Sequence, residues 1–245
     1  MSISAAAVIP SAPVLLPGAS PSLPPEFAET VTQVTAAVGG LIASLDGSEA
    51  LVLLAGAPDA ESAGVYLTPQ ADLGGLSRPD LSTALTTATQ ASELAAELGL
   101  AVRTQDLPVD VAVLALQAAH AGWSGPVLPI AVPWDDGAAL VQFGSMLARY
   151  DVAVLAAGDL AAGLSTKAPR HEVTGAAEWD AAATAAVGAG DVAGLEALGP
   201  AEARRVGARA WPALVVLLGA LKAGGLGLSV AYDAPRGVGY VVGST

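Results

Sequence analysis

The sequence predicts an α/β protein, with a central, mostly parallel or mixed sheet sandwiched by helices in a three-layer arrangement. Short aliphatic runs alternate along the chain with longer segments whose apolar residues recur every three or four positions. Several of the short runs are apolar throughout, which is typical of strands covered on both faces. No internal repeat stands out and no low-complexity linker divides the chain. We therefore expect residues 1–245 to form a single α/β domain.

Eight apolar runs are predicted to be strands. The last two flank the turn "DAPRG", whose composition is that of an ordinary hairpin turn. In chain order the predicted strands are residues 4–9, 50–54, 100–104, 111–114, 127–132, 152–156, 228–232 and 238–242.

Five segments are predicted to be helices. Apolar residues from Phe27 to Leu45 step by three or four positions and form a single stripe. A similar stripe runs from Leu81 to Leu98, after a Pro-Asp pair that offers a helix start. The other three predicted helices are residues 140–150, 176–187 and 211–221, the last buried because it is apolar on all sides.

The composition excludes several classes of function. The net charge is −13 with only ten basic residues, so neither nucleic acid nor an anionic membrane is an expected partner. The chain has no cysteine, which excludes disulfides, thiolate nucleophiles and iron–sulfur clusters. The N-terminal segment lacks a basic n-region, and the run 211–221 is too short to span a bilayer. We expect a cytoplasmic protein, and the Ala- and Gly-rich, Lys-poor composition favours a high-GC, actinobacterial type of source.

Four strand ends carry the segments where a ligand is expected, because ligands of open α/β sheets bind beyond the carboxyl ends of the strands. The segments are "IPSAP", "AGAPD", "VPWDD" and "GDLAAG". From them, and from the hairpin turn, Ser11, Asp59, Asp159 and Asp233 are the candidate ligand-binding residues. Asp159 is the best placed, although its side chain could equally cap the turn that follows the strand.

These segments resemble the class III extradiol ring-cleavage dioxygenases, which form the LigB-like superfamily together with the Memo proteins. "AAVIPSAPVLLPG" is similar to the family's opening strand and Pro-His-Pro-Pro turn, and "ALVLLAGAP" to the strand that ends in Ser-Pro-His. "DVAVLALQAAHAGWSGPVLPIAVP" resembles the Asp-His-Gly segment, "VAVLAAGDLAAGLS" the Gly-Asp-Leu-Ser-His segment, and "YDAPRGVGYVVG" a closing hairpin. All five follow the family's order, and together they span most of the chain.

The resemblance implies a non-haem Fe(II) held by two histidines and a carboxylate, with a further histidine as acid and base. This chain departs from that pattern at every histidine. The four positions correspond to Ser11 or Ala12, to about Ala57, to Val111 after Asp110, and to Ala162. Alanine and valine cannot bind iron or move a proton, and serine is a poor Fe(II) ligand. We therefore expect no metal and no cofactor, and Fe(II) only if the chain is instead a divergent metal-dependent enzyme.

The remaining candidates each have a structural and a functional interpretation. His120 and His171 are the only histidines, and both are interpreted as surface or half-buried side chains. His171 could alternatively contact an anion together with Lys167 and Arg170. Asp159 and His171 are thus the weak candidates for a catalytic role, and Asp233 could replace an acidic residue of the family or simply form its turn.

Two further clusters leave both interpretations open. Asp135 and Asp136 could form a carboxylate pair, but they are better explained as the cap of the following helix. Arg204, Arg205 and Arg209 form the densest basic cluster, which would be a solvated helix face or a contact for phosphate or an acidic partner.

The leading hypothesis is a LigB-like protein that has lost extradiol dioxygenase chemistry and binds a small molecule or a protein. The alternative is a divergent metal-dependent oxidoreductase or dioxygenase that acts on a catechol-like molecule in the same pocket, with Asp159, Asp233 and a histidine converging on one point. A third possibility is that the chain works as a homo-oligomer or as one component of a larger complex.

Overall fold

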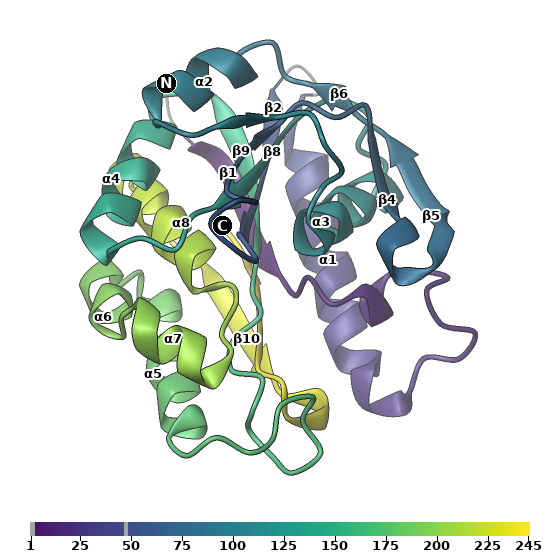
Figure 1. Ribbon diagram of the computed structural model, residues 1–245, viewed down its shortest axis with the longest axis vertical. Helices are drawn as coiled ribbons and strands as arrows, with labels where there is room; N and C mark the ends of the chain where they lie inside the picture. The colour runs from purple at the N-terminus through teal and green to yellow at the C-terminus, as the bar shows by residue number, and fades with distance from the viewer. Residues whose placement is uncertain (1–2, 47–48) are drawn as a thin grey trace.

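The protein has three layers, a central sheet with helices on both faces (Figure 1). The computed structural model describes residues 3–46 and 49–245. This architecture confirms the predicted fold class. The helices of the described residues are α1 (Ala28–Ser44), α2 (Ala91–Glu97), α3 (Val109–His120), α4 (Gly137–Leu147), α5 (Ala176–Ala189), α6 (Val192–Ala197), α7 (Pro200–Val206) and α8 (Trp211–Gly224).

The central sheet is parallel in the middle and antiparallel towards its edges. Its strands are β1 (Ile3–Ile9), β2 (Ala50–Gly56), β3 (Gly64–Tyr66), β6 (Thr86–Thr87), β7 (Val102–Arg103), β8 (Pro126–Val132), β9 (Val152–Ala157), β10 (Ser229–Asp233) and β11 (Tyr240–Ser244). Their order is β10-β11-β1-β9-β2-β8-β3-β7, with β6 beside β8. Strands β1, β9, β2 and β8 pair in parallel, whereas β11 is antiparallel to β1 and forms the expected hairpin with β10.

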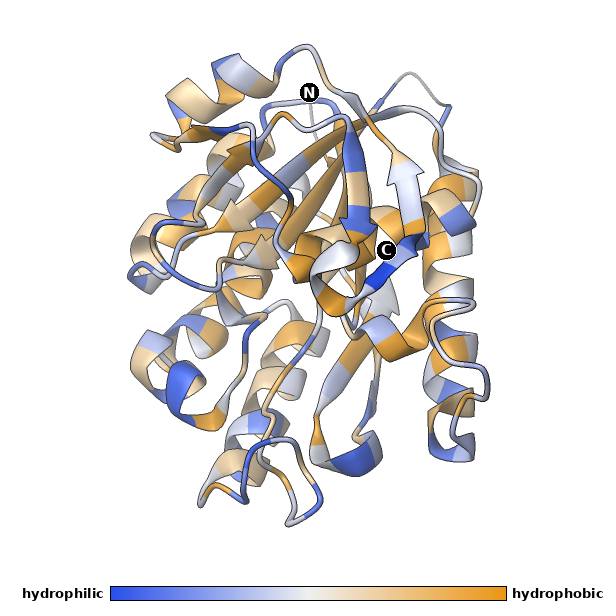
Figure 2. Cartoon of the chain, turned by 45° about the vertical axis from the view of Figure 1, so that its right-hand side comes forward, coloured by the Kyte–Doolittle hydropathy of each residue, from blue (hydrophilic) through white to orange (hydrophobic). Residues whose placement is uncertain are grey.

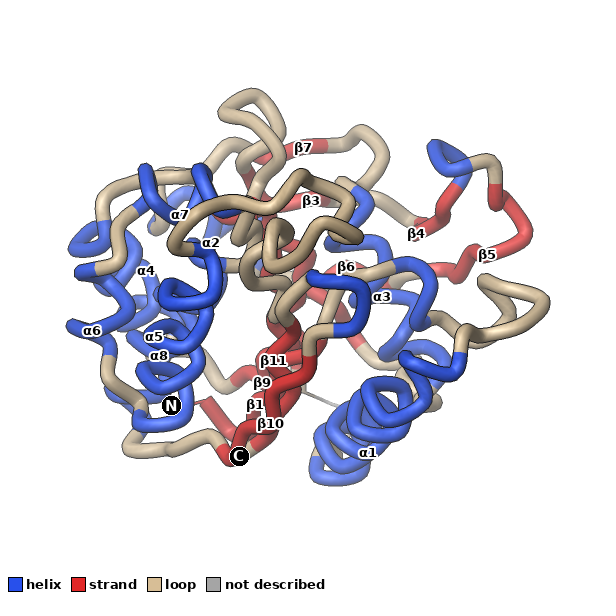
Figure 3. Tube along the Cα trace, turned by 90° about the horizontal axis from the view of Figure 1, so that it is seen from below, coloured by secondary structure: helices blue, strands red, loops and turns tan. Residues whose placement is uncertain are grey.

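Helices cover both faces of the parallel strands. Helices α1 and α3 lie on one side, and α4 to α8 lie on the other (Figure 3). All residues of β9 are buried, as are all but the first residue of β2 and of β8. Figure 2 shows these strands as a hydrophobic band in the middle of the molecule. Because both faces of these strands are covered, neither face carries polar side chains, and polar side chains are confined to the strand ends.

Helix α8 is the most buried helix, as its apolar composition predicts. Every residue from Trp211 to Leu221 is buried between the sheet and α4. The two helices approach closely because Gly144 of α4 faces the backbone of α8. A Cβ atom at Gly144 would lie 2.1 Å from the carbonyl oxygen of Val216.

Two predicted elements are wrong. Residues 81–98, predicted as one helix, instead form most of β5 (Arg78–Ala84), then β6 and α2. Strand β5 pairs with β4 (Gln70–Leu73) in a separate two-stranded sheet. The leucine spacing fits a helix, but alternating exposure along β5 and the β-branched threonines that follow favour strands. Residues 111–114, predicted as a strand, lie in α3, because a wholly buried apolar run has no periodicity to distinguish the two states.

The prediction at the sheet edge is partly right. Of residues 100–104, only Val102 and Arg103 are a strand, paired with β3. Helices α6 and α7 are short and were not anticipated; they lie between α5 and α8 on the same face of the sheet. Within residues 3–46 and 49–245, no helix combines the length and hydropathy needed to cross a bilayer.

The contact between α4 and α8 predicts opposite effects for two helical glycines. The substitution Gly144→Ala forces a methyl group against the backbone of α8 and is expected to lower the free energy of unfolding by about 1–3 kcal/mol. The control Gly40→Ala, at an exposed position of α1 with open space around it, is expected to raise that free energy by about 0.5–1 kcal/mol. Urea unfolding followed by circular dichroism measures both, and equal stabilities of the two variants would contradict the packing.

Candidate binding site

The four strand-end segments meet at one cavity with a volume of about 620 Å³. Ala12 contributes from the segment after β1, Ala57 from that after β2, Trp134 from that after β8, and Asp159 from that after β9. The cavity therefore lies at the carboxyl end of the parallel strands, where the twist of the sheet and the crossover connections leave a crevice. Its remaining wall comes from residues further along the loop after β9, from the end of α7 and from the start of β11.

Asp159 is the buried acidic group of this cavity, with 6% of its surface exposed. Its Oδ2 accepts hydrogen bonds from the backbone N–H and the hydroxyl of Ser11, at 2.7 and 2.5 Å. Burial raises the pKa of Asp159, while the two hydrogen bonds from Ser11 act in the opposite direction. The structure thus brings together two of the predicted candidates, Ser11 and Asp159.

A second carboxyl group lies beside the first. Asp110, in the first turn of α3, is 7% exposed, and its Oδ1 accepts a hydrogen bond at 2.9 Å from Nη2 of Arg209. Burial raises the pKa of Asp110 to about 6; the Arg209 guanidinium opposes this shift and the nearby charge of Asp159 adds to it. The sequence placed Asp110 in the family's Asp-His-Gly segment but did not single it out as a site residue.

Tyr240 completes the buried polar end of the cavity. It is 5% exposed and pairs through its backbone with Asp159 in an isolated antiparallel bridge. Burial raises the pKa of its phenol, and the Asp159 charge raises it further. No hydrogen bond of its hydroxyl is found among residues 3–46 and 49–245, and Tyr240 lines the cavity, so the O–H is a candidate donor to a ligand.

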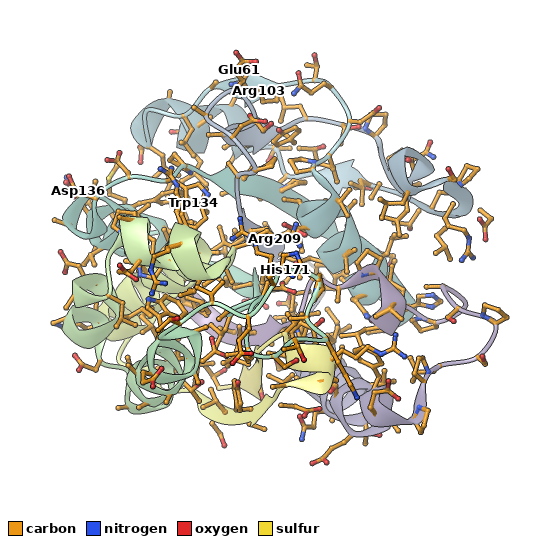
Figure 4. The ribbon with its side chains drawn as sticks, turned by 60° about the horizontal axis from the view of Figure 1, so that its bottom comes forward. Glu61, Arg103, Trp134, Asp136, His171 and Arg209 are labelled. Atoms are coloured by element: carbon orange, nitrogen blue, oxygen red, sulfur yellow. The ribbon has the colours of Figure 1, made fainter. Side chains whose placement is uncertain are left out.

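Three arginines form the outer wall, Arg170, Arg204 and Arg209. The Arg204 guanidinium lies over the ring of Trp134, 4.8 Å from its centroid. The Arg170 Nη1 donates to the carbonyl of Arg204 at 3.0 Å. Gly207, at φ 81°, ends α7 and makes room for Arg170, because a Cβ there would lie 2.8 Å from the Arg170 Nη1. Figure 4 labels Trp134 and Arg209 among the side chains of this region.

Trp134 has a fixed orientation in this wall. Its indole N–H donates to the carbonyl of Ala57 at 2.8 Å, and its ring stacks on Trp211 with centroids 6.1 Å apart. The helix α8 thereby supports the ring on which Arg204 rests. A rigid aromatic platform reduces the entropy that Arg204 would lose on binding a ligand.

A third buried carboxyl group shapes the loop after β9. Asp180 of α5 accepts hydrogen bonds from the backbone N–H of Ala161 and from the hydroxyl of Tyr232, both at 2.7 Å. Burial raises the pKa of Asp180 to about 6. These bonds tie the segment Ala161–Ala162 to α5 and to the hairpin, which fixes Ala162 at the edge of the cavity.

The other predicted site residues lie outside the cavity lining. Asp59 is exposed and accepts from the backbone N–H of Ser62 at 2.7 Å, which is a turn-capping role. Asp233 accepts from the backbone N–H of Ala234 and from the hydroxyl of Thr30, so it joins the hairpin to α1. His120 is exposed at the last residue of α3, the opposite end of that helix from Asp110.

Two residues of the loop after β9, His171 and Lys167, and the helix-capping Asp136 also lie outside the cavity lining. His171 is exposed, and it and Lys167 do not line the cavity, whereas their neighbour Arg170 does. Asp136 caps α4 by accepting from the backbone N–H of Ala139 at 2.8 Å, which confirms the capping interpretation.

The residues present do not fit the Fe(II) site that the resemblance implies. Ala12, Ala57 and Ala162 line the cavity, but their side chains have no atom that can bind a metal, and Val111 is fully buried in α3. The two carboxylates are bound to Ser11 and Arg209. Within the described residues no three His, Cys, Asp or Glu side chains are grouped as metal ligands would be.

The arginines and aromatic residues of the wall were missed as a group. The cluster Arg204-Arg205 with Arg209 is visible in the sequence, but its two interpretations could not be separated without knowing which side chains face the sheet. The structure divides them, since Arg204 and Arg209 line the cavity while Arg205 pairs with Glu202 at 2.6 Å. No local signal relates Trp134 or Tyr240 to them.

Comparison with known proteins supports the fold alone. No protein-family model matches the chain, and no curated protein sequence matches it. The chain is similar in structure to an uncharacterized protein of Escherichia coli K12, JW3007, known from a crystal structure. The TM-score is 0.59 and the sequence identity 14%, over 98% of this chain and 99% of the other.

The burial of Asp110 predicts how stability depends on pH. The folded state holds its proton up to a pKa of about 6, against about 4 in an unfolded chain, so Asp110 stabilises the fold most below pH 4. This contribution is lost as pH rises through 6. The free energy of unfolding of the wild type minus that of Asp110→Asn should therefore fall by about 3 kcal/mol or less from pH 4 to pH 7.

Urea unfolding at a series of pH values measures this difference. The control Glu61→Gln replaces an exposed carboxyl group by an amide and measures the general effect of removing one negative charge. A difference between wild type and Asp110→Asn that stays constant with pH would show that Asp110 ionises in the fold as it does in the unfolded chain.

Proposed function

We propose that this chain is a LigB-like protein that binds a small molecule in this cavity and does not carry out iron-dependent ring cleavage. One observation carries the proposal. The positions that the resemblance aligns with the family's histidines include Ala12, Ala57 and Ala162, which come from three distant segments and yet line one cavity. Their convergence supports the alignment, and their side chains cannot perform the family's chemistry.

The cavity has the features of a site for a small molecule. Its volume of about 620 Å³ falls within the range of ligand pockets, and its walls are mainly apolar or aromatic. A few polar groups converge on it, among them Asp159, Tyr240 and Arg204. Buried carboxyl groups with raised pKa values are themselves typical of functional sites.

The proposal includes a cytoplasmic location in a bacterial cell, which a strongly acidic, cysteine-free chain fits. The divergent metal-dependent enzyme is not favoured by any contact. It needs Asp159, Asp233 and a histidine around one point, but Asp233 is bonded to Thr30, and both histidines are exposed and are not part of the cavity lining.

Iron binding and oxygen consumption test the loss of chemistry. The purified chain, loaded anaerobically with excess Fe(II) and then desalted, is expected to retain no stoichiometric iron by elemental analysis. With catechol or protocatechuate it should consume no more oxygen than buffer with the same iron. One Fe(II) per chain together with oxygen uptake would overturn the proposal.

Binding at the cavity is tested with a variant that fills it. A ligand-observed NMR screen of small fragments is expected to find binders to the wild type that Ala162→Phe abolishes, because the new ring occupies the cavity. The control Ala36→Phe, on the exposed face of α1, should keep them. If no fragment distinguishes the wild type from Ala162→Phe, the cavity is not a binding site.

A further inference from the structure

The cavity is locally basic in a protein that is strongly acidic. The chain carries 23 acidic and ten basic residues, and three of those ten are in the wall of this cavity. The charged side chains of the lining are three guanidinium groups and one carboxylate. A surface of this composition would be expected to contain more carboxylates than guanidinium groups, so the charge of this cavity is the reverse of the charge of the chain.

Two arginines of this wall, Arg170 and Arg204, have no ion pair among the described residues, unlike three arginines elsewhere in the chain. Arg205, Arg236 and Arg78 each form an ion pair with an exposed glutamate or aspartate. Among the described residues, the Arg204 guanidinium forms no hydrogen bond and rests on the Trp134 ring. Arg170 uses one nitrogen on a carbonyl group, and Arg209 uses one on Asp110.

The remaining N–H groups of this wall suit an oxyanion. A guanidinium group presents its donors in a planar fork that matches a carboxylate or a phosphate, and such charge-assisted bonds are about twice as strong as neutral ones. Arg204 is already oriented by Trp134 and supports Arg170 through its own carbonyl group. The wall is therefore organised before a ligand arrives.

Asp159 and Tyr240 add complementary polar contacts in the same cavity. Asp159 is an acceptor there, and the Tyr240 hydroxyl lacks a partner among the described residues. The lining also includes small apolar side chains such as Ala12, Ala57 and Val238. A ligand that uses all of these contacts needs an anionic group, an apolar body, and a hydroxyl group.

We propose that the cavity binds a small organic oxyanion, a carboxylate or a phosphate ester, through Arg170, Arg204 and Arg209, with a hydroxyl group of the ligand that donates to Asp159 and accepts from Tyr240. This inference rests on the proposed binding function and specifies its ligand class. Asp110 regulates the site because it holds Arg209 in an ion pair. Loss of the Asp110 charge releases Arg209 for the anion.

Four probes with the same ring test the charge preference. They are benzoate, phenyl phosphate, benzyl alcohol and benzylammonium, titrated into the wild-type chain by calorimetry or NMR. The two anions are expected to bind, and the neutral and cationic probes to bind at least about tenfold more weakly. The tighter of the two anions identifies carboxylate or phosphate as the natural group.

Variants assign the binding to the arginine wall. Arg204→Gln and Arg209→Gln should each weaken the tighter anion by about tenfold, whereas Arg205→Gln, next in the chain but paired with Glu202, should leave it unchanged. Arg204→Lys keeps the charge without the fork and should weaken phenyl phosphate. Anion binding by the wild type should become tighter as pH falls below about 6, because Asp110 then loses its charge. Asp110→Asn should bind the anion more tightly than the wild type at pH 7 and should not show this pH dependence. The polar and charged groups around Asp110 are Asp159, Ser11, Tyr240 and Arg209.

The outcomes separate this inference from the function on which it rests. If benzyl alcohol binds as tightly as the anions and Ala162→Phe abolishes it, the cavity binds small molecules but the anion preference is wrong. If Arg205→Gln weakens the anions as much as Arg204→Gln does, the attraction is non-specific and the inference is overturned. If no probe and no fragment binds, both proposals fail. Unfolding curves of each variant establish that it is folded before titration.

Discussion

Asp159 is the residue through which the separate parts of the site are joined. A carboxylate buried at the end of a strand is costly unless it is hydrogen-bonded, and Ser11 meets this need with its backbone N–H and its hydroxyl. The backbone carbonyl of Asp159 accepts from the N–H of Ala210 at 3.0 Å, just before α8, and its backbone pairs with Tyr240. One residue therefore holds the ends of β1 and β9 against the start of α8 and of β11.

The position of the site follows from the burial of the sheet. Strands β1, β9, β2 and β8 are covered by helices on both faces, so a polar side chain within them would have no partner. Small aliphatic residues fill this interior, and close helix contacts such as that at Gly144 depend on them. Polar groups are left for the strand ends, and the parallel direction of these strands collects four ends at one edge.

The sequence was sufficient for the parts of the structure with a regular pattern and insufficient for the contacts between distant segments. Strand ends in a parallel sheet are neighbours, so Ser11 and Asp159 could be expected to lie near each other. The helix 211–221 was evident from its composition, but α3 was mistaken for a strand over 111–114 because it is buried on nearly all sides. Arg209 and Tyr240 reach the cavity only through the packing of α8 and the hairpin, which no local pattern describes.

An anion that binds to this acidic protein is repelled by its net charge at long range and attracted by the arginines at contact distance. The charge of −13 repels an approaching anion, but salt at physiological strength screens such charges beyond about 8 Å. Inside the cavity the arginines act at contact distance, where screening is weaker. Asp110 also affects binding, because its negative charge, paired with Arg209, weakens the attraction between Arg209 and a bound anion. Affinity in such a site therefore depends more on the arrangement of a few guanidinium groups than on the net charge of the chain.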